Sequence, residues 1–484
     1  MLERLRSSLS FLEEPVRSVV HAVPSCLPDT TVLAAAGLLA GSSTAALLVQ
    51  SEKGEALGLV TDLEIRRGLP EALRDSRTPV RRIMSAPLLT LLDDAPVYEA
   101  LQAMEESRVK HLVVENADRQ VVGVVDVATL LQFQSYGALV LAREIARAGS
   151  VEEVVRLCRR TAGLVAMLLR CGAAPRHLTH MIASVSDATG ERLVKLAIAE
   201  LGPPPCDFAF VALGSQARHE QTLATDQDNA IVFAPQEVAD EEALRGYFTQ
   251  LGRRVCGWLD QAGYRACKGD VMASNPAWCL SLTAWKETFR RWIRESTPRQ
   301  LVELSIFFDL RAVTGNGALV TDLRRDIHAT VSANPDFLPR LAQSSLEFRP
   351  PVRLFGRILP GGAGGEHLGR LDLKDASHPI STFARVFALR HGVQESSTTG
   401  RLRALVEGEV LSATTGDDVL AAFDHMMRLR IRHQVSQTLA DQQPDNVVQL
   451  SRLSTTELTL LKQGFAAIEA VQSKTRFELL GGTS

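Results

Sequence analysis

The sequence predicts a multidomain protein of mixed α/β and α class, and three observations support this prediction. The chain has 484 residues, which is several times the length of a typical domain. Landmarks in its first part recur at an offset of about 65 residues. A β-rich segment follows a Gly-Pro-Pro-Pro stop at 202–205, and it lies between stretches whose apolar residues have helical spacing.

The composition is that of an ordinary globular protein, with 45% apolar and 23% charged residues, which excludes disordered, collagenous and coiled-coil chains. With 53 Lys and Arg against 56 Asp and Glu, no global basic field favours a nucleic-acid partner. The start lacks an apolar core of signal-peptide length and no long apolar run follows, so we expect a cytoplasmic protein without membrane insertion. The seven cysteines form no C-x-x-C pair, which argues against disulfides and a zinc site.

The internal repeat predicts two similar units, at 10–75 and 76–135. Each unit has the order helix, strand, strand, helix. The matching landmarks are Pro15-Val16-Arg17 with Pro79-Val80-Arg81, Leu47-Leu48-Val49 with Leu112-Val113-Val114, and Gly58-Leu59-Val60 with Gly123-Val124-Val125.

Two such units resemble a tandem pair of cystathionine-β-synthase (CBS) domains, modules that often hold adenosine nucleotides in the cleft between them. The resemblance implies an adenosine nucleotide as a ligand, and we expect a homodimer through the pair. Ligand-binding members carry Thr or Ser after a strand and Asp three residues later. Thr61 and Glu64 nearly match that pattern. The second unit has Asp126 and Thr129 there, and an anion at Asp126 would repel phosphate. A purely structural or dimerising pair is the alternative.

The remaining chain divides into three segments by its apolar spacing. A helical connector is predicted at 136–205 and an α/β domain at 206–317, followed by a mostly helical domain at 318–484 that a glycine-rich loop interrupts at 360–369. Within the α/β domain we expect strands at 208–213 and 229–233 and a long amphipathic helix at 241–261.

The residues that carry chemistry lie between the two predicted strands. One strand ends at Gly214-Ser215, and the next is expected to begin with Asp226 and Asp228. Residues two apart on a strand share a face, so the two carboxylates would repel each other unless divalent cations bind them. Hard cations prefer such oxygen ligands. Gly214 would let the backbone approach a phosphate, and the Ser215 hydroxyl could bind terminal phosphate oxygens. We therefore expect Mg²⁺ or Mn²⁺ and a nucleoside triphosphate.

This order of strand, Gly-Ser, short helix and Asp-x-Asp resembles the polymerase-β-like nucleotidyltransferase fold. The runs at 214–233, 270–293 and 305–313 are similar to nucleotidyltransferases related to the amino-terminal domain of protein-PII uridylyltransferase. CBS pairs often precede the transferase-like domain in that family. The runs at 345–358, 365–393, 397–405 and 428–434 resemble the helical domain that follows it and is named for substrate binding.

The resemblance implies a metal-dependent signalling protein that transfers a nucleoside monophosphate to a protein acceptor of the PII kind or to a small molecule. Similar proteins commonly read Gly-Ser-Glu-Gly-Arg-Gly-Glu at the glycine turn, whereas this chain departs at Gln216, Ala217 and His219. Arg218 and Glu220 stand in the expected places, so Arg218 is a candidate phosphate contact. A helix-surface pair of Arg218 with Glu220 is the alternative.

A third metal carboxylate is expected from the strand after the long helix, where Asp270 is the candidate. Asp309 is the second candidate, although it could instead pair with Arg311 or cap the helical domain. This incomplete acidic set motivates another hypothesis, a non-catalytic nucleotide-sensing or partner-binding regulatory protein. The alternating cations at 428–433 are more typical of a solvated helix face than of a nucleotide clamp.

Overall fold

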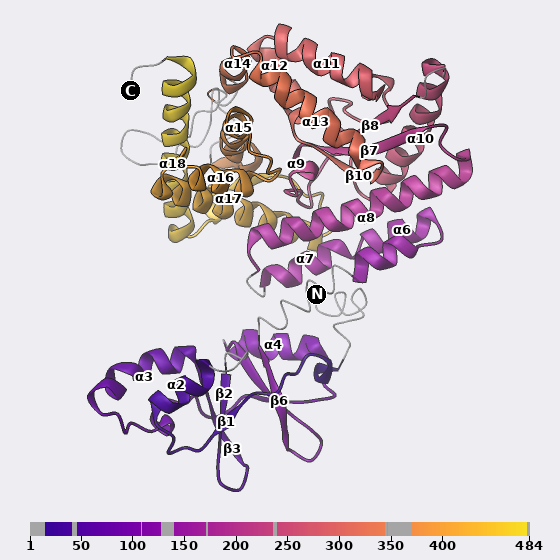
Figure 1. Cartoon of the computed structure of the whole chain (residues 1–484). Helices are drawn as coiled ribbons and strands as arrows, with labels where there is room; N and C mark the ends of the chain where they lie inside the picture. Colours follow the sequence, from indigo (N-terminus) through magenta and orange to yellow (C-terminus); the bar gives the residue numbers. More distant parts are fainter. Residues whose placement is uncertain are drawn as a thin grey trace. The chain divides into compact units, whose positions relative to one another are not determined.

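The computed structural model describes residues 15–40, 46–107, 109–126, 140–170, 173–235, 240–343, 346 and 369–481. Thr129, the run at 347–358 and nearly all of the loop at 360–369 lie outside these residues. The chain forms two compact units, Met1–Gly137 and Ala138–Ser484 (Figure 1). Among the helices of the described ranges, none is both long and apolar enough to cross a membrane.

The first unit contains the predicted repeat as two three-stranded sheets of the same build. The first repeat consists of β1 (Ser25–Cys26), α2 (Val32–Ala40), β2 (Ala46–Gln50), β3 (Ala56–Thr61) and α3 (Asp62–Arg74). The second consists of β4 (Thr90–Leu92), α4 (Val97–Ser107), β5 (His111–Glu115) and β6 (Val121–Asp126). Its elements start about 65 residues after their counterparts. In both sheets the first strand pairs parallel and the last antiparallel to the middle strand.

Two glycines of this unit lie where another segment of the chain approaches the sheet closely. A Cβ on Gly123 would lie 2.4 Å from the carbonyl oxygen of His21, which pairs with the neighbouring Val124. A Cβ on Gly58 would lie 2.6 Å from the sulfur of Met84, beside the bridge between Leu59 and Ser85. The Gly-h-h landmarks of the sequence therefore mark the points where another segment crosses each sheet.

The second unit is built on a four-stranded sheet in the order β10-β7-β8-β9. Its strands are β7 (Asp207–Leu213), β8 (Asn229–Ala234), β9 (Cys279–Ser281) and β10 (Leu310–Gly315). β7 pairs antiparallel to both β10 and β8, whereas β8 and β9 are parallel. Because both faces of β7 are covered, every residue from Phe208 to Leu213 is buried.

Helices cover both faces of this sheet and continue beyond it. α11 and α13 pack on β8 and β7, whereas α10 packs on β9 and α8 on β10 (Figure 1). A continuous hydrophobic core joins the α11 and α13 side of the sheet to the helical segment that follows. The helices are α6 (Val151–Cys158), α7 (Thr161–Arg170), α8 (Pro175–Leu201), α9 (Gly214–Ala217), α10 (Glu241–Gln261), α11 (Leu282–Glu295), α12 (Pro298–Leu304), α13 (Gly317–Ser332), α14 (Phe337–Gln343), α15 (Leu373–His391), α16 (Thr398–Glu407), α17 (Ala413–Leu439) and α18 (Thr455–Leu480). Two short strands, β11 (Arg370–Asp372) and β12 (Val447–Gln449), pair antiparallel within the helical part.

One strand boundary differs from the sequence prediction. β8 matches the apolar run predicted at 229–233 and begins at Asn229, whereas the motif analysis expected Asp226 and Asp228 to be its first residues. The segment before Asn229 pairs elsewhere, because Asp226 forms a parallel bridge with Arg265 and the Gln227 amide donates to the Arg265 carbonyl at 2.7 Å. The two aspartates therefore lie in an extended segment that leads into the strand.

Candidate active site

The glycine turn that follows β7 lies directly against Asp228. Gly214 has a φ of +54°, and a Cβ there would lie 2.7 Å from Cγ1 of Ile306 and 3.8 Å from Oδ2 of Asp228. Glycine is therefore the residue that this left-handed, crowded position accepts. The Leu213 amide also donates to the Asp228 carbonyl at 2.9 Å. The structure thus brings Gly214 and Asp228 together, although 13 residues separate them in the sequence.

The two aspartates of the Asp-x-Asp motif have different surroundings. Burial raises the pKa of Asp228 to about 6, although a hydrogen bond with the Cys267 thiol and the charge of Lys374 oppose the rise. Asp226 is also partly exposed, and its Oδ1 lies 3.3 Å from Nε of Arg265. Asp228 is therefore a half-buried carboxylate whose cationic neighbours offset only part of its desolvation.

Ser215 follows Gly214 in the short helix α9 and carries a hydroxyl group. Its carbonyl oxygen accepts the Glu220 amide at 2.8 Å, which closes the loop after α9. The side chain is partly exposed, and its hydroxyl has no hydrogen-bond partner among the residues that the structure describes. This free hydroxyl, on the residue after Gly214, is available to a ligand.

Asp270 is not brought into a carboxylate cluster with Asp226 and Asp228. Asp270 is exposed in a loop, where its Oδ2 accepts from Asn275 and its carbonyl accepts from the Trp278 indole, both at 2.8 Å. The strand after the long helix is β9, whose residues Cys279, Leu280 and Ser281 include no acid. Within the described ranges, no three His, Cys, Asp or Glu side chains form a group that could hold a metal ion.

Asp309, the second candidate for that third carboxylate, is the centre of a buried charge cluster. Its side chain is 1% exposed and bonds Arg218 at 2.7 Å, Arg385 at 2.7 Å and Arg401 at 2.6 Å. Burial alone would raise the pKa of Asp309, but these three guanidinium groups hold it well below its usual range. Arg311 pairs with Asp187 at 2.9 Å instead. Asp309 therefore joins the sheet to helices α15 and α16.

Arg218 belongs to the same buried cluster. Its Nε bonds Glu220 at 2.7 Å, and the second carboxylate oxygen of Glu220 accepts the Thr398 amide at 2.6 Å. Burial would lower the pKa of Arg218, but the charges of Glu220 and Asp309 raise it above its usual range. Arg218 thus pairs with Glu220 as in the alternative interpretation, but the pair is largely buried and does not lie on an exposed helix surface.

The helical domain contributes side chains to this region that the sequence interpretation missed. Arg430 is buried, where a solvated helix face was expected, and burial lowers its pKa to about 10 against the opposing charges of Asp372 and Glu220. Gln434 accepts the Ala224 amide at 3.2 Å. The 428–434 run was the signal available, but alternating cations do not reveal which of them face inward.

In the first unit, Thr61 and Glu64 form the N-terminal cap of α3. The Thr61 hydroxyl and Glu64 carboxylate are hydrogen-bonded, and the Thr61 amide donates to Glu64 at 3.0 Å. Ser85 donates to the other oxygen of Glu64 at 3.1 Å, and Glu64 is 8% exposed. Asp126, at the matching end of β6, lies 3.2 Å from His21. The structure thus brings Thr61 and Glu64 together, and their side chains are hydrogen-bonded to each other.

Three family models match the chain. One is a CBS domain at residues 80–136, one is described as "Putative nucleotidyltransferase DUF294" at 159–299, and one as "Putative nucleotidyltransferase substrate binding domain" at 335–479. The chain therefore carries a CBS domain and both DUF294 domains. The first DUF294 domain contains the glycine turn and both motif aspartates, and its match begins early enough to include α7 and α8. Arg385, Arg401 and Arg430 lie in the second.

Individual relatives of this chain match about a quarter of its length. An arabinose 5-phosphate isomerase of Pseudomonas aeruginosa is 27% identical over 25% of this chain and 36% of its own. An uncharacterized protein of Methanopyrus kandleri is 23% identical over 22% of this chain and 56% of its own length. The chain thus spans only about a third to a half of these curated relatives.

Solved structures also resemble a quarter of the chain. A conserved protein of Pyrococcus horikoshii is 27% identical, with 25% of this chain and 92% of that one covered and a TM-score of 0.24. A CBS domain protein of Pyrobaculum aerophilum, solved with AMP, is 24% identical over 25% of this chain and 98% of that one, with a TM-score of 0.22.

Proposed function

We propose that the protein is a metal-dependent nucleotidyltransferase that moves a nucleoside monophosphate from a nucleoside triphosphate to an acceptor. The observation that carries this proposal is the contact between the glycine turn and the motif: Oδ2 of Asp228 lies 3.8 Å from the Cβ position that Gly214 leaves empty. Phosphate can approach the backbone there, next to a carboxylate pair that attracts cations.

The donor set suits Mg²⁺ or Mn²⁺, which carboxylate oxygens bind preferentially. Asp226 and Asp228 would hold the metal, and burial of Asp228 without full compensation makes a bound cation favourable there. When bound, such ions neutralise the charge that develops on a phosphoryl group and its leaving group. Asp270 stays a weaker candidate, since Asn275 and an exposed loop hold it apart from the pair.

The chain's own residues would position the nucleotide. The free hydroxyl of Ser215 would donate to a terminal phosphate oxygen, and Gly214 would keep the space beside it open. Lys374, whose charge acts on Asp228, would neutralise part of the triphosphate. Arg218 already binds Glu220 through Nε and Asp309 through Nη1, so we assign it mainly to holding the turn, with Nη2 as the donor that a phosphate would meet.

We further propose that an adenosine nucleotide binds the CBS pair at Thr61 and Glu64 and regulates the transferase, and that the pair makes the chain a homodimer. The acceptor would be a protein of the PII kind or a small metabolite. The supporting observations are the repeat architecture and the Thr61–Glu64 pair at the end of β3, where the two side chains form one polar group.

The test is release of pyrophosphate from ATP, UTP, CTP or GTP with Mg²⁺ and candidate acceptors. We expect Asp226→Asn/Asp228→Asn to abolish release and Glu191→Gln, an exposed carboxylate on α8, to leave it unchanged. Equal release by the double variant and the wild type would overturn the proposal.

A second candidate function is a non-catalytic nucleotide sensor or partner-binding protein, which the absence of an acid on β9 favours. Calorimetry with nucleotide and Mg²⁺ distinguishes the two functions. Tight binding without turnover across the acceptor panel supports the sensor, whereas a labelled transfer product excludes it.

A further inference from the structure

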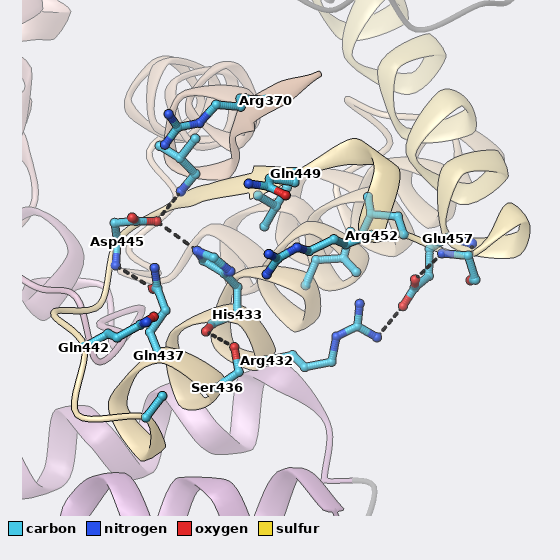
Figure 2. A pocket seen from close by; sticks show the side chains of 16 residues that line it. Arg370, Arg432, His433, Ser436, Gln437, Gln442, Asp445, Gln449, Arg452 and Glu457 are labelled. Carbon is cyan, nitrogen blue, oxygen red and sulfur yellow. Dashed lines mark hydrogen bonds and ion pairs between the residues drawn. The ribbon is translucent and has the colours of Figure 1, made fainter. Parts of the chain in front are cut away.

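The helical domain contains a pocket that is lined mostly by polar residues and has a volume of about 1020 Å³ (Figure 2). It is formed by the β11–β12 pair, the C-terminal half of α17, the loop after it and the start of α18. Ligand pockets of small molecules usually measure about 300–1,000 Å³. The size therefore suits a small molecule, and the polar lining suits a hydrophilic one.

Two of the cations that line this pocket lack an anionic partner among the described residues. Arg432 is paired with Glu457, and the His433 ring lies 2.8 Å from Asp445. Arg370 and Arg452 make no ion pair with any residue that the structure describes. Figure 2 shows Arg452 extending toward His433, while Arg370 lies at the opposite edge on β11. The pocket thus has three guanidinium groups against two carboxylates.

The two carboxylates are ionised and already bound, so they cannot neutralise the remaining arginines. Burial would raise the pKa of Asp445, but the Val447 amide and His433 lower it. Burial would likewise raise the pKa of Glu457, but hydrogen bonds from Arg432 and the Ser454 amide lower it. An anion entering the pocket would therefore meet uncompensated positive charge.

We propose that this pocket binds a small polar metabolite that carries a phosphate or carboxylate group, with Arg370 and Arg452 contacting the metabolite from opposite edges of the pocket. A guanidinium group presents paired N–H donors whose geometry matches either anion. The amides of Gln442 and Gln449, which also line the pocket, supply hydrogen bonds for the rest of the molecule. This proposal is independent of the transfer reaction.

The pocket is connected to the motif segment by a short chain of hydrogen bonds. Asn446, next to Asp445, accepts from Nε of Arg430 at 2.6 Å and from Nε2 of Gln434 at 2.9 Å. Gln434 in turn accepts the Ala224 amide, two residues before Asp226. A ligand that moves the 445–446 segment would therefore alter contacts of the loop that leads into the Asp-x-Asp motif.

The test is calorimetric titration of the full chain, without Mg²⁺, with two probes: ribose 5-phosphate for phosphate and citrate for carboxylate. We expect at least one probe to bind with a Kd of about 1 mM or lower. Arg370→Gln and Arg452→Gln should each weaken binding about tenfold, because each removes a charge-assisted hydrogen bond. Arg476→Gln, an exposed arginine of α18 outside the pocket, is the matched control and should leave Kd unchanged.

Arg452→Lys distinguishes binding through directed hydrogen bonds from attraction by positive charge alone, since lysine keeps the charge and loses the paired N–H donors. A Kd between those of the wild type and Arg452→Gln supports a directed contact. The proposal is overturned if neither probe binds at about 10 mM, or if Arg370→Gln/Arg452→Gln binds as the wild type does.

Discussion

The main-chain amide of Gly214 donates a hydrogen bond to the carbonyl oxygen of Asp309 at 3.0 Å. The carboxylate of the same Asp309 is bound by Arg218, Arg385 and Arg401. One residue therefore connects the glycine turn of the candidate site to helices α15 and α16. Because a buried cluster of this kind has few alternative arrangements, we infer that the helical domain holds the turn in its left-handed geometry.

The first prediction concerns the stability that Asp309 contributes. Asp309→Asn leaves three buried guanidinium groups without their shared carboxylate, and we expect the free energy of unfolding to fall by about 3–5 kcal/mol. Urea unfolding followed by tryptophan fluorescence measures it, since all four tryptophans lie between residues 258 and 292. The control is Glu191→Gln, which removes an exposed pair with Lys195 and should cost no more than about 1 kcal/mol. Equal losses in the two variants would contradict the prediction.

The second prediction is the pH dependence that follows from the same group. The folded pKa of Asp309 lies well below its unfolded value of about 3.9, so its contribution to stability is present above that value. As the pH falls from about 5 through 3.9 and below, the unfolded chain binds a proton that the folded chain does not, and the free energy of unfolding falls. Urea midpoints across this range should fall less steeply for Asp309→Asn. Parallel curves for the two proteins would show that Asp309 does not titrate as described.

The third prediction is that Gly214→Ala disrupts the candidate site. An alanine there adopts a φ of +54° and places its Cβ 2.7 Å from Ile306, so we expect a loss of about 1–3 kcal/mol. Pyrophosphate release should fall to background because the turn moves away from Asp228. Gly246→Ala in α10 is the control: nothing lies within 4 Å of its Cβ position, and it should gain about 0.4–1 kcal/mol. Full activity in Gly214→Ala would contradict the proposed phosphate position.

The sequence predicted those features that depend on local pattern. The repeat, the long helix at 241–261 and the strand that ends at Gly214 follow from periodicity and turn residues, and the structure confirms them. The partners of Asp309 could not be predicted, because Arg385 and Arg401 are 76 and 92 residues away. The expectation that Asp226 begins this strand was wrong because Asp226 and Gln227 pair with Arg265, a contact between segments that no local pattern reveals.

The fourth prediction is that the protein is a dimer through α2 and α3 of the CBS pair. These helices contact each other, and they carry large apolar side chains on the surface: Leu33, Leu38, Leu63, Leu69 and Leu73 are 37–73% exposed. Such a patch indicates an interface. In sedimentation equilibrium we expect a dimeric wild type and a monomeric Leu69→Glu/Leu73→Glu. Leu460→Glu, at an exposed leucine of α18, should stay dimeric. A monomeric wild type, or a double variant that dimerises as well as the wild type, would exclude this interface.

The last prediction concerns adenosine nucleotide at Thr61 and Glu64. The ribose hydroxyls of AMP would replace the hydrogen bonds that Glu64 now accepts from Thr61 and Ser85. Equilibrium dialysis with labelled AMP tests this in the Asp226→Asn/Asp228→Asn background without Mg²⁺, where the transferase site should not contribute. We expect one AMP per chain, and Thr61→Val and Glu64→Gln should each weaken binding about tenfold, because each leaves a polar group of the ligand unpaired.

Both substitutions also damage the cap of α3, so a matched capping control is needed. Thr297 and Gln300 form the same kind of capping box in the other unit, and Thr297→Val should leave AMP binding unchanged.

At 100 times its Kd, AMP should stabilise the first unit by about 2.7 kcal/mol. That unit has no tryptophan, so hydrogen exchange of β3 is the readout. If AMP regulates the transferase, nucleotide at the transferase site must change the affinity for AMP by the same factor in the wild type. A protein that binds no AMP and shows unchanged exchange in β3 would leave the CBS pair with a structural role alone.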